Sequence, residues 1–200
     1  MTGNCMAYPV LISLANIDAN ICSKTLLHGY FLLALLPIPK NVHKDSCVCG
    51  LLKKQLFHQA LNHILAPLKT AATIGVIMSN PGGNLQYCYT LLASWITDTQ
   101  EECLIAGMGP MASLVTTAIF KHFSNPFCHS THTSQTTLLA IWTTCAEHDP
   151  SDYKNFLQVV RCLSLNSVID PVWIDWLLSK PCEFITPEAL HHFYQFLALL

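Results

Sequence analysis

The stretch GVIMSNPGGNLQYCYTLLASWITDTQEECLIAG, residues Gly75 to Gly107, contains the signals for a hairpin, a strand and a helix in direct succession. Two β-prone runs flank Asn80-Pro-Gly-Gly-Asn84, and this density of turn residues predicts a β-hairpin over 75–90. The apolar run Leu91 to Ile96 predicts a further strand, which ends at Thr97-Asp98. Residues 100–106 have the pattern of the first turns of a helix. Strand and helix are therefore expected in one core.

The segments before this stretch predict two more strands and a long helix. The runs YPVLISLANI (8–17) and YFLLALL (30–36) combine β-branched with large apolar residues, which is typical of buried strands. Between residues 51 and 69 apolar side chains recur at intervals of three and four, so a helix with one apolar face is expected. Pro67 is expected to bend or end that helix.

The segments after the stretch are mainly helical. Residues 107–133 are rich in Gly, Pro, Ser, Thr and His and predict a connector rather than core. A helix is expected over 136–147, and Asp149-Pro-Ser-Asp152 predicts another, with Asp149 as its N-cap, that runs to about residue 163. Thr186-Pro-Glu188 predicts the start of a final helix that is still apolar at Leu200. These elements together predict the α/β class in its mixed α+β form.

Composition limits the possible functions. The chain is 52% hydrophobic and 11% charged, whereas soluble domains usually have about 25% charged residues. We therefore expect some apolar surface to meet a partner subunit or a flanking segment. The formal net charge is -2 and Arg161 is the single arginine, so there is no basic stripe for independent DNA binding. There is no secretory signal, and the longest apolar run, 26–36, is about half of the roughly 20 residues that a membrane span needs.

The ten cysteines are spread almost evenly along the chain and form no CxxC pair. Reduced, buried thiols in an intracellular protein are the favoured interpretation over a disulfide framework. A zinc site made of Cys128, His129 and His132 is an alternative, although its tetrahedral ligand set is incomplete. Phosphate-binding loops, GxSxG and HExxH motifs are absent from the sequence.

Asp98 is the best-placed candidate ligand for a hard cation. It follows an apolar strand directly and precedes a helix, so its carboxylate would project from the end of a strand, as in magnesium-dependent nucleases. Asp98-Thr-Gln-Glu101 also fits a helix capping box, and the residues alone favour the cap. Glu101 and Glu102 are expected to be solvated in the first helical turn. Glu188 would complement the dipole of the last helix, and His191 follows it there.

Five ordered blocks resemble the Plavaka-type transposases of fungal genomes, a branch of the CACTA-like DNA transposons. The blocks are YPVLISLANID (8–18), LLALLPIPK (32–40), LFHQALNHILAPLKTAATIGVIMS (56–79), LLASWITDTQEECLIAG (91–107) and FITPEALHHFYQ (184–195). They occur in family order and cover most of the chain, and the connector over 107–133 is the least similar part.

The resemblance implies an RNase H-like DDE/D core with a helical insertion. Residues 1–107 would form part of the core, 108–183 the connector and insertion, and 184–200 the returning helix. The resemblance aligns Asp98 with the second acid of the site and Glu188 with the late acid, both as ligands of Mg²⁺. It aligns His191 with a family histidine that contacts phosphate or supports a ligand. DNA would be the partner in intact relatives, and the nucleus the location.

Three departures from the family pattern weaken the expectation of activity. The family's first acid belongs to a segment just before the YPV strand, where this chain has no carboxylate. A cysteine pair that many members carry after the second acid is replaced here by GMGPMASLV, and the last helix stops at Leu200. We therefore expect a fragment of a transposase catalytic domain that is inactive alone, with oligomerisation or missing flanking segments possible. The alternatives are a noncatalytic, transposon-derived interaction module and a product that does not fold stably.

Overall fold

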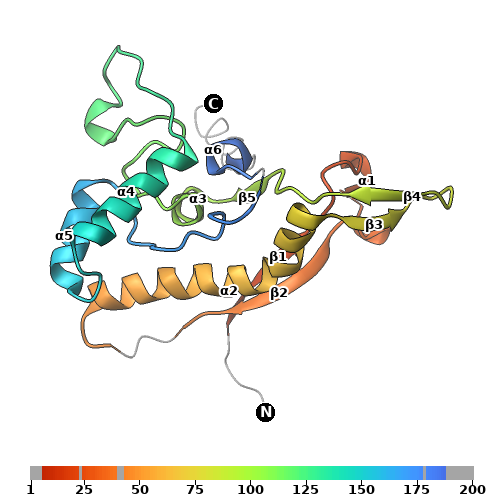
Figure 1. Cartoon of the computed structure of the whole chain (residues 1–200), viewed down its shortest axis with the longest axis horizontal. Helices are drawn as coiled ribbons and strands as arrows, with labels where there is room; N and C mark the ends of the chain where they lie inside the picture. The colour runs from red at the N-terminus through yellow and green to blue at the C-terminus, as the bar shows by residue number, and fades with distance from the viewer. Residues whose placement is uncertain (1–5, 23, 40–42, 178, 188–200) are drawn as a thin grey trace, which may run out of the picture.

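The computed structural model describes residues 6–22, 24–39, 43–177 and 179–187. Helices and strands are mixed, as the sequence predicts, and they are arranged around one long helix (Figure 1). The strands are β1 (Ala7–Ile12), β2 (Phe31–Pro37), β3 (Val76–Ser79), β4 (Leu85–Cys88), β5 (Trp95–Thr97) and β6 (Ile185–Pro187). The α-helices are α1 (Ala19–Cys22), α2 (Ser46–Ile74), α3 (Thr99–Ala106), α4 (Ser134–Glu147), α5 (Tyr153–Cys162) and α6 (Pro181–Phe184), and η1 (Thr25–Leu27) and η2 (Phe120–His122) are 3₁₀ turns.

The described strands form three separate pairs. β1 and β2 are antiparallel with a register shift between Val10 and Leu11, and β3 and β4 form the predicted antiparallel hairpin. β5 and β6 are parallel although almost 90 residues separate them in sequence. Strand β1 is shorter than its predicted range, and only the end of the predicted 91–96 strand is strand β5. The mixed fold class is confirmed.

Helix α2 is longer than predicted. It begins after Asp45, whose Oδ1 accepts a hydrogen bond from Cys47 N at 2.8 Å, and it ends at Gly75, which has φ 74°. The expectation that Pro67 could end the helix is wrong, because the helix continues to Ile74. Proline removes one backbone hydrogen bond, but buried side chains on both sides of Pro67 hold the helix against the core: Leu61, Leu65 and Ala72.

Two apolar clusters form the core. The first joins α2 to β2, α3, α6 and the 172–176 segment, and its buried members are Leu36, Leu61, Leu65, Ala72, Ile105, Val172, Trp173, Trp176 and Phe184. The second lies around α4 and α5 and includes Ile141, Phe156 and Val160. Met108 belongs to the second cluster, so the 107–133 segment is partly core, which corrects its interpretation as a connector only.

Two predicted helix starts differ from the structure. Helix α5 begins at Tyr153 with Asp152 as its N-cap, because the Asp149 carboxylate instead accepts from Ser151 N at 2.8 Å in a turn. Residues 185–187 are strand β6, so the predicted helix does not begin at Thr186. The rest of that predicted helix, including Glu188 and His191, lies outside the described residues. Helices α3 and α4 match their predictions closely, and α4 has a reciprocal capping box between Thr133 and Thr136.

Candidate carboxylate site at the end of β5

Asp98 lies between β5 and α3 and is exposed to solvent. Its backbone is extended, with φ -76° and ψ 164°, and its Oδ1 accepts a hydrogen bond from Glu101 N at 2.8 Å. These features confirm the predicted N-cap, which satisfies one of the amide groups left unpaired at a helix start. The Thr97 hydroxyl donates to the Glu101 carboxylate, so the first turn is bonded to the strand end as well.

The register of the parallel pair brings two chain positions together. Trp95 is opposite Ile185 and Thr97 is opposite Pro187. Parallel strands present their carboxyl ends at the same edge of a sheet, which is where binding residues commonly gather in α/β folds. Asp98 follows one of these paired ends in the sequence, and Glu188 follows the other. Paired residues of β5 and β6 are 90 positions apart in the sequence, so the pairing of these two strands comes only from the fold.

Side chains from two other elements hold the C-terminal end of α3. His58 Nε2 lies 2.9 Å from Leu104 O, Asn166 Nδ2 donates to the same oxygen at 2.9 Å, and Trp173 Nε1 donates to Ile105 O at 2.7 Å. Gly107, with φ 80°, ends the helix in the left-handed conformation. Because helix ends leave carbonyls without intrahelical partners, these bonds fix α3, and Asp98 with it, to the core.

Glu102 is a site-adjacent acid that the sequence placed wrongly. It is 3% exposed, whereas the first-turn position predicted a solvated side chain. Helix α3 packs against β6 and α6, and its buried residues are Glu102, Cys103, Ile105 and Ala106. Burial, followed by the charge of Glu102, raises the pKa of the Cys103 thiol.

The family comparison bears on this site. A family model described as Plavaka transposase matches residues 1–198. The chain belongs to the Plavaka transposase family. No curated protein and no solved structure matches the chain. Membership supports a transposase-related function and an interaction with DNA for this Plavaka transposase chain.

The zinc alternative finds no support in the part of the Plavaka chain that the structure describes. Cys128 is exposed, and within this part no three Cys, His, Asp or Glu side chains are grouped closely enough to hold a metal ion. The rings of His122 and His129 stack with centroids 5.2 Å apart. Burial lowers the pKa of His132, which favours its neutral form. The eight described cysteines are free thiols, as predicted, but only Cys49 and Cys103 are buried, so the predicted burial is wrong for the other six.

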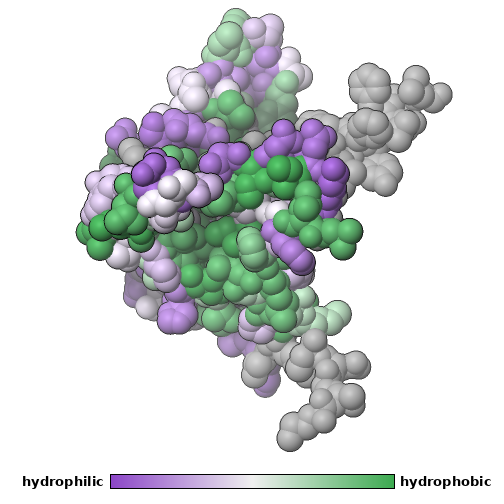
Figure 2. All heavy atoms as spheres, turned by 90° about the vertical axis from the view of Figure 1, so that its right-hand side faces the viewer, coloured by the Kyte–Doolittle hydropathy of each residue, from purple (hydrophilic) through white to green (hydrophobic). Residues whose placement is uncertain are grey.

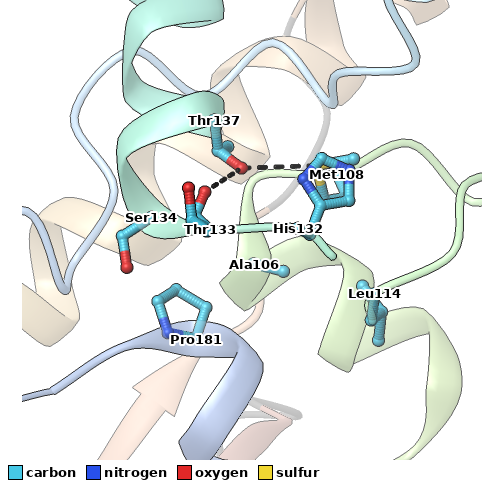
Figure 3. A pocket seen from close by; sticks show the side chains of 8 residues that line it. All are labelled: Ala106, Met108, Leu114, His132, Thr133, Ser134, Thr137 and Pro181. Carbon is cyan, nitrogen blue, oxygen red and sulfur yellow. Dashed lines mark hydrogen bonds between the residues drawn. The ribbon is translucent and has the colours of Figure 1, made fainter. Parts of the chain in front are cut away.

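A small pocket lies beside the start of α4 and is unsuited to a substrate. Its lining includes His132, Ser134 and Thr137 from the α4 side and Pro181 from α6 (Figure 3). The Thr137 hydroxyl contacts Met108 Sδ at 4.0 Å and Thr133 O at 3.3 Å. A volume of about 10 Å³ holds about one water molecule. Asp98 is not among the lining residues, so the candidate site lies elsewhere, at the strand end.

Two of the described lysines, Lys54 and Lys69, make contacts within the fold. Lys69 is buried and pairs with Asp175, and its Nζ also donates to Asn62 Oδ1 at 2.6 Å. Lys54 donates to Asn166 O at 3.1 Å, and burial, followed by the charge of Arg161, lowers its pKa. These cations stabilise the fold instead of facing a phosphate backbone. No helix in the described ranges is long and apolar enough to cross a membrane.

Proposed function

We propose that this chain supplies part of an RNase H-like DDE/D catalytic core in a Plavaka transposase, with Asp98 and Glu188 as Mg²⁺ ligands. The observation that carries the proposal is the parallel register that pairs Thr97 with Pro187. Each of these residues is followed directly in the sequence by an acid, Asp98 after Thr97 and Glu188 after Pro187. His191 comes three positions after Glu188 and would contact a phosphate oxygen or orient a ligand.

The residues present fit a hard cation. Carboxylate oxygens are preferred ligands of Mg²⁺, and Asp98 is exposed at a strand end where a phosphodiester can reach it. Its Oδ1 accepts the amide of Glu101, which fixes the carboxylate without covering it. When bound, Mg²⁺ ions would activate the attacking oxygen and stabilise the leaving oxygen during phosphodiester cleavage and strand transfer. Asp98 would hold the metal, and α3 would hold Asp98.

A further acid is needed for full activity. The unpaired edges of the described strands offer a position for a strand that carries it. Residues 1–17 contain no Asp or Glu. Among the described strands, β1 pairs only with β2 and β5 only with β6. Val10 of β1 and Trp95 of β5 nevertheless pack against the same core cluster. An additional acid-bearing strand, contributed from outside the described residues, would join the two pairs into one sheet. We infer that this chain alone does not cleave DNA.

Metal binding tests the role of Asp98 separately from its role as a cap. Mn²⁺ would replace Mg²⁺ as a paramagnetic probe, with binding followed by water proton relaxation. Asp98→Asn keeps an N-cap oxygen but removes the charge, whereas Asp98→Ala removes both. Both variants should weaken Mn²⁺ binding about tenfold, but only Asp98→Ala should lose about 1 kcal/mol of stability. The matched control is Asp152→Asn at the exposed N-cap of α5. Unchanged Mn²⁺ binding in Asp98→Asn would remove Asp98 from the metal site.

A DNA nicking assay tests the inferred inactivity. The purified chain is incubated with supercoiled plasmid and Mg²⁺, and the nicked fraction is measured against a buffer control. We expect no nicking above the control. Robust cleavage that disappears in Asp98→Ala would overturn the inactivity and would leave the assignment of Asp98 intact.

A second candidate function is a noncatalytic, transposon-derived interaction module. It is favoured by large apolar side chains that are exposed on the β3–β4 hairpin, including Ile77 and Leu85. A stable oligomer that binds no Mn²⁺ would support this function over the catalytic one. For the catalytic function, the expected partner is DNA and the expected location is the nucleus, as transposase membership suggests.

A further inference from the structure

The β3–β4 hairpin exposes apolar side chains on both of its faces. Ile77 is opposite Tyr87 and Ser79 is opposite Leu85 on one face, which Tyr89 extends through an edge contact with Tyr87 at 5.5 Å between ring centroids. Val76 and Met78 point to the other face. The hairpin lies at one end of the molecule, away from α3, α4 and α5 (Figure 1). Figure 2 shows apolar side chains gathered over that end.

The hairpin is built rigidly. In its turn, Asn80 N donates to Asn84 O at 2.9 Å, and Asn84 N donates to Asn80 Oδ1 at 2.9 Å. At its base, the Tyr87 hydroxyl donates to Ile74 O, and the Thr90 hydroxyl donates to Leu68 O on α2. Little conformational entropy would therefore be lost if the hairpin bound a partner.

The hairpin also lacks the features that keep exposed strands apart. From Gly75 to Thr97 the sequence contains no Asp, Glu, Lys, Arg or His. Natural edge strands are usually protected by charged side chains, especially lysine, or by covering elements. An isolated two-stranded hairpin is marginally stable in water and gains stability from further packing. This hairpin therefore has the properties of a covered surface.

We propose that the partner is a second copy of this chain, which packs its hairpin against the first across a twofold axis. The contact face consists of Ile77, Leu85, Tyr87 and Tyr89. A twofold axis brings identical patches together, so an uncharged patch meets no like-charge repulsion. Nucleic acid is not favoured as the occupant, because this face offers no cation to a phosphate backbone. The two hairpins would form a small two-layered sandwich.

The available area matches a reversible dimer. The four side chains are 57% to 74% exposed. At roughly 200 Å² for a fully exposed side chain of this size, they offer about 500 Å² on each copy. The total of about 1,000 Å² is at the lower limit for a specific interface. We therefore expect a dimer that dissociates on dilution in the micromolar range, without a requirement for metal or DNA.

Sedimentation velocity over a range of protein concentrations tests the proposal. The wild-type chain should change from monomer to dimer as concentration rises. Leu85→Lys should remain a monomer, because dimerisation would bury an unpaired charge on the apolar contact face. Leu139→Lys is the matched control, since Leu139 is also 65% exposed but lies in α4, at the opposite end of the molecule from the hairpin (Figure 1). It should dimerise as the wild type does.

Three results would overturn the proposal. One is a wild-type chain that stays monomeric at all concentrations, which would mean that the hairpin binds something other than a second copy of this chain. Another is dimerisation of Leu85→Lys with wild-type affinity, which would place the interface on another surface. The third is growth beyond the dimer, which a closed twofold contact does not permit. Circular dichroism on each variant shows whether the fold is kept, and a second variant, Ile77→Lys, repeats the test if Leu85→Lys fails to fold.

Discussion

Acidification should destabilise this protein through one buried histidine, His58. The side chain is 1% exposed, and its Nδ1 accepts a hydrogen bond from Val172 N at 3.0 Å. Its Nε2 must then carry the proton and donate to Leu104 O. Protonation of Nδ1 would leave a buried charge and would place two donors face to face. Burial accordingly lowers the pKa of His58 from 6.5 to about 4.

The direction and magnitude of this loss of stability follow from the linkage between proton binding and folding. Above about pH 7 the histidine is neutral in both states and has no effect on the pH dependence of stability. Between pH 6.5 and about 4 the unfolded chain binds a proton at His58 and the folded chain does not, so stability falls as pH falls. A difference of about 2.5 pKa units, from 6.5 to about 4, corresponds to roughly 3 kcal/mol at 1.36 kcal/mol per unit.

Urea denaturation at pH 7.5, 6.0, 5.0 and 4.0 measures this effect. His58→Gln cannot titrate, so its stability should decrease less on acidification than that of the wild type, by up to about 3 kcal/mol. His63→Gln is the matched control, because His63 lies on the same helix but is exposed. Its pH profile should follow the wild type. Identical pH profiles for wild type and His58→Gln would refute the assignment of a neutral, buried imidazole.

Three further predictions concern stability and can be checked by thermal or urea denaturation. Gly75→Ala should destabilise by about 2 kcal/mol, because Gly75 has φ 74° and a Cβ would lie 2.2 Å from Tyr87 Cε1; Gly82→Ala, whose Cβ meets nothing closer than 3.4 Å, is the tolerant control. Asp175→Asn should cost about 1 kcal/mol, since it leaves the buried Lys69 charge without its carboxylate. Glu183→Gln removes an exposed pair with Lys180 and should change stability by less than about 0.5 kcal/mol.

Local structure in this chain could be predicted where local chemistry decides it. The β3–β4 hairpin was predictable because Asn-Pro-Gly-Gly-Asn has few alternatives to a turn, and α3 and α4 because their caps and periodicity agree. The errors occur where tertiary packing overrides a local signal. Pro67 does not end α2 because buried neighbours hold the helix, and Thr186-Pro187 forms strand because β5 offers it a partner. Glu102 is buried because α3 packs against β6 and α6.

The sequence was sufficient to predict Asp98 as a candidate site residue, but not which segments of the chain lie beside it. Asp98 could be found because an acid follows an apolar strand. The pairing of β5 with β6 could not be found, because parallel pairing joins segments 90 positions apart without any local signature. The family blocks gave the order of the acids in the sequence. The register of β5 and β6 pairs the two residues that directly precede Asp98 and Glu188 in that sequence. Glu188 and His191 remain predictions, since they lie beyond Pro187.

The sequence offers a cap role and a ligand role for Asp98 as alternatives, but the geometry makes them compatible. A carboxylate has two oxygens, and the cap bond to Glu101 N uses Oδ1. That bond, together with the three side chains that hold the far end of α3, fixes the carboxylate relative to the core. A metal ligand is more effective when its orientation is fixed before binding, because less order has to be imposed by the ion. The cap bond would therefore fix the Asp98 carboxylate in position before a cation binds. The Asp98→Asn variant separates the two roles, because it keeps the cap oxygen but removes the charge.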